Sequence, residues 1–179
     1  MLVACWSVKG GSGTTVVAAA LGMMLASAGP RGATLVDLGG DLPAALGVPE
    51  PEGPGVAQWL DAGAGVAADA LRRLETEVGG GLALVACGGG PMPDAGGERL
   101  AAALAGDRHA VVDCGPPGAG RGNRAGARAA TGRRDVEDVL GVPVRAEVAW
   151  DPVVARRVDA GLLAGNLPRT LERALRRAA

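Results

Sequence analysis

The feature that most constrains the fold is a glycine-rich segment that follows directly on an apolar run near the N-terminus. Residues 2–6 are apolar, and residues 8–15 then read VKGGSGTT, with the only lysine of the chain at Lys9. Glycines let backbone N–H groups turn inward around an anion, and a helix that begins at such a turn directs the positive end of its dipole to the same place. The pattern therefore predicts a strand, a phosphate-binding turn and a helix in succession.

The two threonines that end this segment have different expected roles. A hydroxyl at the final position of such a turn can complete the coordination shell of Mg²⁺, and Thr15 is placed to do so. Thr14 stands where the general pattern, G-x-x-x-x-G-K-[ST], has a lysine that reaches the β and γ phosphates. Loss of that contact costs about 1.5–3 kcal/mol of binding free energy, so nucleotide binding should survive better than turnover. The residues expected to surround the phosphates are Gly10, Gly11, Ser12, Gly13, Thr14 and Thr15.

Beyond this turn, apolar runs alternate with helical segments, an order typical of a mostly parallel sheet with helices on both faces. We expect strands over residues 2–7, 33–38, 82–87, 109–114 and 142–150. We expect helices over residues 15–27, 67–77, 94–105, 133–140 and 168–177. A length of 179 residues suits one α/β domain over residues 1–179.

Two aspartates, Asp37 and Asp113, lie at the ends of expected strands. Both should therefore lie at the carboxyl edge of the sheet, beside the glycine-rich turn, where open α/β sheets bind ligands. His109 is the only histidine, and the three cysteines form no C-x-x-C pair. These features exclude a histidine-based metal cluster and a Ser/His/Asp triad.

Three motifs together resemble those of the ParA/MinD family of dimeric ATPases. VKGGSGTT is similar to the family's deviant Walker A loop, TLVDLGGD at residues 34–41 to its second strand and switch I, and HAVVDCGPP at residues 109–117 to its Walker B strand and switch II. The resemblance implies a P-loop NTPase-like fold, ATP and Mg²⁺ as cofactors, and a homodimer that forms when ATP binds. Members that act in pilus assembly and septum placement, and that tolerate altered Walker residues, look closest.

The resemblance also implies roles for single residues. Lys9 would be the signature lysine, which reaches the phosphates bound by the partner subunit. Thr15 and Asp113 would hold Mg²⁺, and Asp37 would position the network of metal-bound water.

Two departures from the family pattern bear on hydrolysis. Thr14 replaces the lysine that serves the nucleotide of its own subunit, and Gly39 stands where the family has a second, hydrolysis-linked acid. The resemblance then implies a weak ATPase at most. Asp41 either replaces the missing acid or is the N-cap of a helical segment over residues 42–46.

The C-terminal part contains the largest expected departure from the family. Residues 115–132 are rich in Gly, Arg and Ala without apolar periodicity, which indicates a loop or linker. The family has further strand and helix units there, so the chain looks shortened by about one βαβ unit. Residues 142–163 resemble the family's closing strand and following helix, and Trp150 and Pro152 fall where members contact the adenine ring. A tryptophan that caps the edge of the core is the alternative.

The distribution of charge suggests further partners but does not favour them. The last 59 residues carry twelve arginines against seven acids, and such a segment could contact DNA backbone or a membrane surface. Arginines on solvated helix faces explain the same pattern, so neither partner is favoured. No apolar run reaches the roughly 18 residues of a membrane span, and the N-terminus has no charged region typical of a signal peptide, so we expect a cytoplasmic protein.

Three classes of function remain open. The first is an ATP-dependent dimerising switch that positions a septum site, a pilus or a chromosome with a protein partner. The second is a NAD-type dinucleotide-binding oxidoreductase with Asp37 on the ribose, although its fingerprint G-x-G-x-x-G lacks the third glycine at Val16. The third is a relic that binds no nucleotide and acts only through protein interaction.

Overall fold

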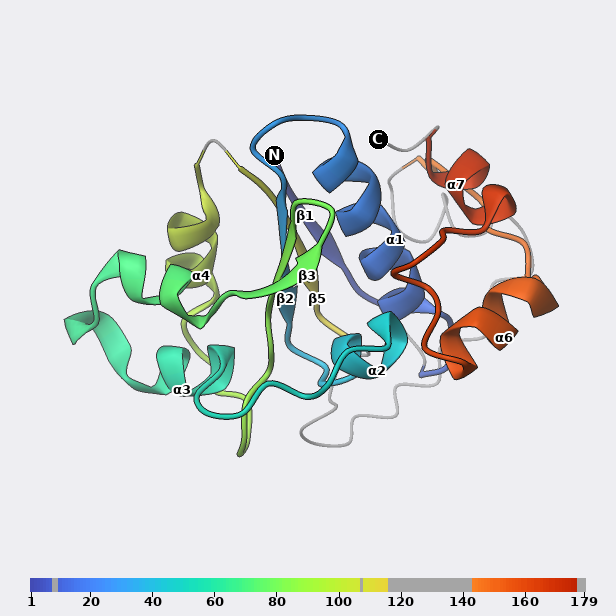
Figure 1. Ribbon diagram of the computed structural model, residues 1–179. Coiled ribbons are helices and arrows are strands. Elements are labelled where there is room, and N and C mark those ends of the chain that lie inside the picture. Colours follow the sequence, from blue (N-terminus) through green and yellow to red (C-terminus); the bar gives the residue numbers. More distant parts are fainter. Residues whose placement is uncertain (8–9, 107, 116–142, 177–179) are drawn as a thin grey trace.

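The computed structural model describes residues 1–7, 10–106, 108–115 and 143–176, which contain a five-stranded sheet with helices on both faces (Figure 1). The strands are β1 (Leu2–Cys5), β2 (Ala33–Asp37), β3 (Thr76–Gly79), β4 (Leu82–Val85) and β5 (His109–Asp113). Their order across the sheet is β1-β5-β2-β4-β3, and all neighbours are parallel except β3 and β4. The four parallel strands predicted from the sequence are confirmed.

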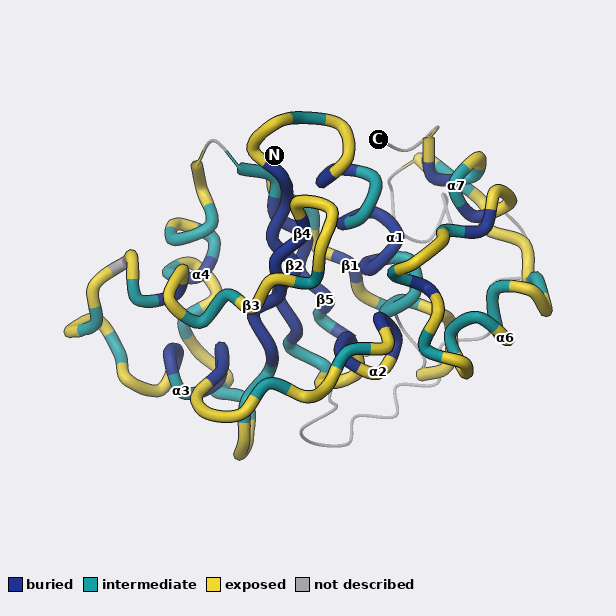
Figure 2. The backbone as a smooth tube through the Cα atoms, viewed as in Figure 1, coloured by how far each residue is buried: buried dark blue, intermediate teal, exposed yellow. Residues whose placement is uncertain are grey.

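The central strands are mostly apolar because both faces of the sheet are covered. Every residue of β2 and β4 is buried, as the dark blue stretches of Figure 2 show. A strand that is covered on both faces has no solvent side, so it loses the alternation of apolar and polar residues. This arrangement confirms the predicted α/β class.

The helices form two groups, each with its own cluster of buried side chains. The first group is α1 (Thr14–Ser27), α2 (Leu42–Leu46), α6 (Pro152–Asp159) and α7 (Arg169–Leu175). The second group is α3 (Val56–Asp61) and α4 (Gly97–Leu104), which pack with Leu71 on the other face. The predicted helices over residues 15–27, 94–105 and 168–177 are confirmed, the last two over shorter spans.

Helix α1 packs closely on the sheet because its inner side is made of very small residues. Residues 18–20 are alanines with no exposed surface. A Cβ atom added at Gly22 would lie 2.7 Å from Cδ2 of Leu35 in β2, so glycine is required for this approach. The first residues of α1 are thereby held at a fixed position beside the sheet.

The helix predicted over residues 67–77 is wrong. This segment forms two short 3-10 turns, Ala68–Ala70 and Arg72–Leu74, and then enters β3. Three consecutive glycines, Gly79–Gly81, follow with positive φ angles of 116°, 59° and 79°, and they let β3 turn back antiparallel on β4. The segment forms a hairpin and not a helix because its pairing with β4 and the turn glycines outweigh a weak helical periodicity.

The strand predicted over residues 142–150 is also wrong over its described part. Residues 143–150 form neither strand nor helix, and six of the eight are exposed. Apolar and polar residues alternate there as in a strand, but alternation forms a strand only when a neighbour offers backbone pairing. The predicted helix over 133–140 and the predicted loop over 115–132, apart from Gly115, lie outside the described residues.

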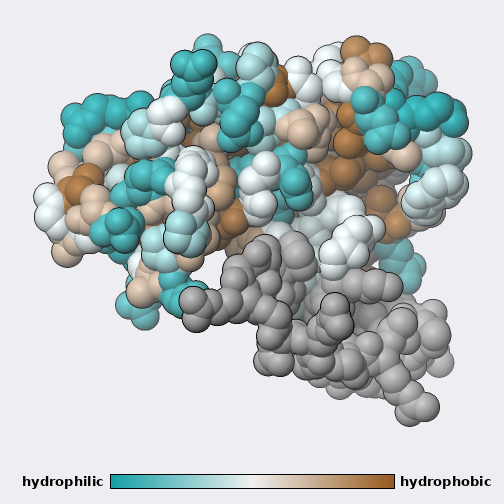
Figure 3. All heavy atoms as spheres, turned by 90° about the horizontal axis from the view of Figure 1, so that it is seen from below, coloured by the Kyte–Doolittle hydropathy of each residue, from teal (hydrophilic) through white to brown (hydrophobic). Residues whose placement is uncertain are grey.

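The surface has apolar residues on the side of the C-terminal helices. Seen from below, hydrophobic residues reach the surface in the right half of the view, with hydrophilic residues around them (Figure 3). Val153 and Leu162 are 42% and 57% exposed. Among the described residues, no helix has the length and apolarity that crossing a membrane requires.

Candidate functional site

The glycine-rich loop connects β1 to α1 and leaves open space in front of the helix. Gly11 and Gly13 have φ angles of 77° and 84°, which other residues rarely adopt. No described residue has an atom within 4 Å of a Cβ atom built at either position or at Gly10. These glycines therefore serve the backbone conformation of the loop, and the described residues leave space beside them for a ligand.

The first turn of α1 faces this space without a side-chain cap. Gly13 is the N-cap residue, no side-chain capping bond is formed within the described residues, and no acidic residue lies in the first turn. The hydroxyls of Ser12 and Thr14 lie 3.1 Å apart, within hydrogen-bond distance, and Thr15 is half-buried beside them. An uncapped helix start with hydroxyl groups beside it can accept an oxyanion.

The two predicted aspartates are brought together at this edge of the sheet. Asp37 and Asp113 are register partners at the ends of β2 and β5, and both are fully buried. Asp113 also pairs in register with Cys5, the last residue of β1, from which the glycine-rich loop continues. Lys9, the third expected functional residue, lies outside the described residues.

Both carboxylate oxygens of Asp37 are used to fold the chain that follows β2. Oδ1 accepts from the backbone N–H groups of Gly39 and Gly40 at 3.0 and 2.7 Å, and Oδ2 accepts from Leu42 at 2.9 Å. Burial raises the pKa of Asp37, and these three donors oppose that shift. The visible role of Asp37 is to fix the loop and the start of α2.

The carboxylate of Asp113 differs, because one of its oxygens has no partner in the described part of the chain. Oδ1 accepts from the N–H of Gly115 at 3.1 Å, whereas the buried Oδ2 accepts from none of the described residues. Buried polar atoms are almost always paired in native proteins, so an unpaired oxygen of this kind indicates an additional partner such as a water or an ion.

A hollow of about 740 Å³ lies in front of the loop. It is bounded by Ser7, by the loop and first turn of α1 from Gly10 to Val16, by Gly115 after β5, and by α2 and the end of α6. Among the described lining residues the only charged side chains are Asp41 and Asp159, both negative. A cation bound together with a phosphate ligand would offset these two negative charges.

Asp41 lies at the start of α2, as the expected N-cap role requires, but its side chain does not cap this helix. It occupies the N-cap position of α2 without a side-chain capping bond, and Oδ2 of Asp37 accepts from Leu42 in its place. The exposed carboxylate of Asp41 lines the hollow. This leaves the side chain available to orient water.

Trp150 and Pro152 lie away from this hollow. The side chain of Trp150 is 82% exposed, Pro152 is the first residue of α6, and neither lines the hollow. The sequence analysis missed Val158 and Asp159, which α6 contributes to the wall. In the structure, Gly47 after α2 and Gly161 after α6 lie in close contact, since a Cβ atom at Gly47 would be 2.0 Å from the carbonyl oxygen of Gly161. The two glycines are visible in the sequence, but their contact is not.

The cysteines near the site are unreactive thiols. Burial, together with the charge of Asp113 and with Cys114, raises the pKa of Cys5 to about 11. Burial and Asp113 also raise the pKa of Cys114. A raised pKa disfavours the thiolate, which is the form that attacks or binds a metal.

Comparison with solved structures identifies the architecture that holds this site. The chain superposes on the crystal structure of a ParA family ATPase from Chlorobium tepidum TLS with a TM-score of 0.64, over 97% of this chain and 95% of that one. The chain has the fold of a ParA family ATPase. Sequence identity over the match is 16%, so the likeness shows the fold alone. No family model and no curated protein matched the sequence.

Proposed function

We propose that this ParA-like chain binds ATP with Mg²⁺ in the hollow in front of the glycine-rich loop. The observation that carries the proposal is the buried Oδ2 of Asp113, which has no partner among the described residues and lies at the same edge of the sheet as the start of α1. Such an oxygen suits a cation or its water, and the helix start suits phosphate.

The described residues fit Mg²⁺ held jointly with a nucleotide. They contain no group of three or more His, Cys, Asp or Glu side chains that could hold a metal alone. Mg²⁺ commonly takes one or two protein oxygens and completes its shell with water and phosphate. Thr15 and Asp113 would supply the protein side of that shell, and the backbone of residues 10–15 would surround the phosphates. The bound ion would neutralise phosphate charge.

Hydrolysis is proposed to be weak or absent. Phosphoryl transfer requires positive charge at the γ-phosphate and an oriented water. Thr14 supplies no charge, and its hydroxyl lies against Ser12. Gly39 supplies no carboxylate, so Asp41 is the described acid best placed to orient water from the wall of the hollow.

We further propose that ATP binding drives formation of a homodimer in which Lys9 reaches the phosphates of the partner subunit. This switch would position a septum site, a pilus or a chromosome through a protein partner. The resemblance of VKGGSGTT to the deviant Walker A loop supports the role of Lys9. We also propose that Trp150 and Pro152 contact the adenine ring. Because neither residue lines the hollow, this contact requires the nucleotide to extend beyond it or this segment to move. The DNA backbone and the membrane surface remain unfavoured partners.

Calorimetric titration tests the binding site. Wild-type protein should bind ATP with Mg²⁺, should bind far more weakly when EDTA removes the ion, and should not bind NAD. Asp113→Asn should lose at least about tenfold in affinity, since one charge-assisted contact is worth about 1.5–3 kcal/mol. The matched control is Asp61→Asn, an exposed aspartate at the end of α3, which should bind as wild type.

Three results would contradict the proposal. Binding of NAD in place of ATP would support the oxidoreductase alternative. No binding of either nucleotide by protein with a native circular dichroism spectrum would support the relic. Equal affinities of Asp113→Asn and wild type would show that Asp113 does not serve the metal.

A further inference from the structure

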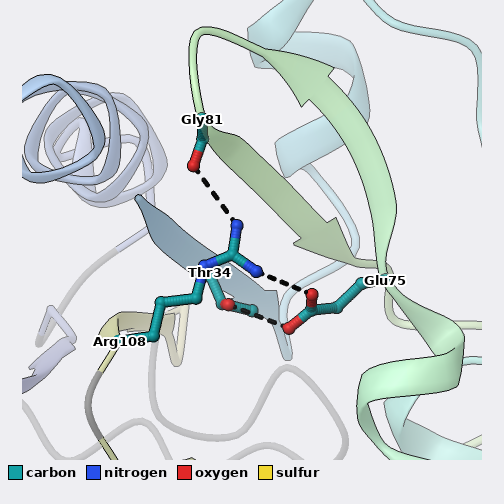
Figure 4. Close-up of polar contacts among 4 residues, drawn as sticks. All are labelled: Thr34, Glu75, Gly81 and Arg108. Carbon is teal, nitrogen blue, oxygen red and sulfur yellow. Dashed lines mark hydrogen bonds and ion pairs between the residues drawn. The ribbon is translucent and has the colours of Figure 1, made fainter. Parts of the chain in front are cut away.

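A second group of charged side chains lies at the opposite edge of the sheet from the glycine-rich loop. His109 begins β5, whereas Asp113 ends it, so the two positions are about 13 Å apart along the strand. Near the start of β5, Arg108 and Glu75 form an ion pair that is largely shielded from solvent, with 2.9 Å between Nη1 and Oε2 (Figure 4). The proposed ATP site uses none of these residues.

Both carboxylate oxygens of Glu75 accept hydrogen bonds from described residues. Its Oε2 accepts from Arg108, and its Oε1 accepts from the hydroxyl of Thr34 at 2.9 Å. Arg108 also donates from Nη2 to the carbonyl oxygen of Gly81 at 3.3 Å (Figure 4). These contacts hold the Arg108 guanidinium in one place between the start of β2 and the turn from β3 to β4.

Two neighbouring hollows border this fixed guanidinium. The inner one is about 100 Å³, and its lining includes Glu75, Arg72, Arg108 and His109. The outer one, which we call the basic hollow, is about 520 Å³ and is lined by Arg31, Arg72, Gly106 and Arg108. Arg72 and Arg108 line both, so the two hollows are neighbours.

Several hydrogen-bonding groups here have no partner in the described part of the chain. Nε of Arg108 and Nδ1 of His109 are buried and unpaired. Nη2 of Arg72 lies beside Gly106, 3.4 Å from where a Cβ atom of that residue would be. No described residue accepts a hydrogen bond from the Arg72 guanidinium. Buried unpaired groups indicate an additional partner, and guanidinium groups match the oxygens of phosphate and carboxylate.

We propose that the inner hollow binds the phosphoryl group of a small anion, either free phosphate or a phosphate monoester whose remainder would lie in the basic hollow. The phosphoryl oxygens would accept from Arg72, from Nε of Arg108 and from the His109 ring. The volume of the outer hollow leaves room for the remainder of a monoester. This site is independent of the ATP site, since it lies at the other edge of the sheet and shares no lining residue with it.

The single histidine of the chain makes the test specific. His109 gives the only imidazole signals in a proton NMR spectrum, and it lines the inner hollow. At constant pH and ionic strength, inorganic phosphate should shift these signals saturably, whereas the same charge added as chloride should not. Arg72→Gln should weaken the response at least tenfold.

Arg73→Gln is the matched control for that variant. It removes the same charge from the next residue, but Arg73 pairs with Asp69 at 3.0 Å on the exposed surface and lines neither hollow. Arg72 is likewise exposed, so both variants should fold. Arg73→Gln should respond as wild type, and so should Asp113→Asn, because its substitution lies at the ATP site.

The proposal is overturned if phosphate produces no saturable shift of His109, if Arg72→Gln and Arg73→Gln respond alike, or if Asp113→Asn abolishes the response. Ribose 5-phosphate, titrated in parallel, distinguishes the two sources. Tighter binding than inorganic phosphate supports the site and identifies a monoester as its ligand, whereas equal or weaker binding supports the site and identifies free phosphate.

Discussion

Asp37 and Asp113 occupy equivalent positions at the ends of neighbouring strands but have different surroundings. All the hydrogen bonds of Asp37 go to the backbone that follows it, whereas Asp113 keeps one buried oxygen without a described partner. The first aspartate therefore supports local structure, and the second is the better candidate for a metal. The resemblance to the family gave both a role in the site and could not separate them.

Replacement of Asp37 should destabilise the fold. In Asp37→Asn the amide group would place a donor opposite the N–H of Leu42, which would lose its acceptor at the start of α2. Loss of a buried, charge-assisted hydrogen bond predicts a fall of about 2–3 kcal/mol in the free energy of unfolding, measured by urea denaturation. The exposed control Asp61→Asn should change this value by less than about 0.5 kcal/mol. Equal stabilities of the two variants would show that the Asp37 contacts carry little weight.

The missing catalytic groups should be restorable because the backbone leaves room for them. A Cβ atom at Gly39 would meet only ordinary contacts, the nearest at 3.7 Å from Cα of Gly115, and the φ angle of Gly39 is not positive. Thr14→Lys should raise the affinity for ATP about tenfold or more. Adding Gly39→Asp should then raise the rate of phosphate release above that of either single variant. Unchanged affinity in Thr14→Lys would indicate that the loop does not surround phosphate.

Cys5 should make stability depend on pH in the alkaline range. Its pKa is raised from 9.0 to about 11 on folding, so the stabilising contribution of the neutral thiol is complete below pH 9 and is lost as pH rises through 11. Between pH 8.5 and 11, reduced wild-type protein should lose about 1–2 kcal/mol more than Cys5→Ala, after allowance for partial solvent exposure. Parallel losses in urea denaturation of both proteins would contradict this assignment.

Helix α1 and strand β2 show how composition determines the spacing of elements. With only 2% aromatic residues, the chain builds its core from Leu, Val and Ala, and α1 lies close to the sheet through Gly22. Gly22→Ala would bring a methyl group within 2.7 Å of the Leu35 side chain, an overpacking that should cost about 1–3 kcal/mol in the free energy of unfolding. Gly29→Ala, where a Cβ atom meets nothing within 4 Å, is the matched control and should not destabilise. A smaller loss in Gly22→Ala than in the control would show that α1 can move away without cost.

The elements that the sequence predicts have a local pattern, whereas the others depend on contacts between segments that are far apart in the chain. Strands β1, β2, β4 and β5 are mostly apolar runs, buried except in the edge strand β1, and their pattern is local. The glycine-rich loop is also a local motif, so the sequence could predict both. Strand β3 depends on pairing with β4, and residues 143–150 show a strand-like pattern without pairing. The contribution of α6 to the hollow depends on the contact between Gly47 and Gly161, which are far apart in the sequence.

The chain combines a ParA-like fold with a candidate site for which we propose nucleotide binding and weak hydrolysis. The nearly equal coverage of the two superposed chains, 97% and 95%, gives them similar lengths over the match. The predicted loss of a βαβ unit concerns residues that lie outside the described part of the chain. A nucleotide that is bound and hydrolysed slowly suits a switch whose output is assembly, not turnover.

Sedimentation velocity, with and without ATP and Mg²⁺, tests this central claim most directly. Wild-type protein should be monomeric alone and dimeric with the nucleotide. Lys9→Ala should still bind ATP in calorimetry but should remain largely monomeric, because its lysine serves the partner's nucleotide. A wild-type protein that binds ATP yet stays monomeric at every concentration, or a Lys9→Ala variant that loses binding and dimerisation equally, would contradict the proposed switch.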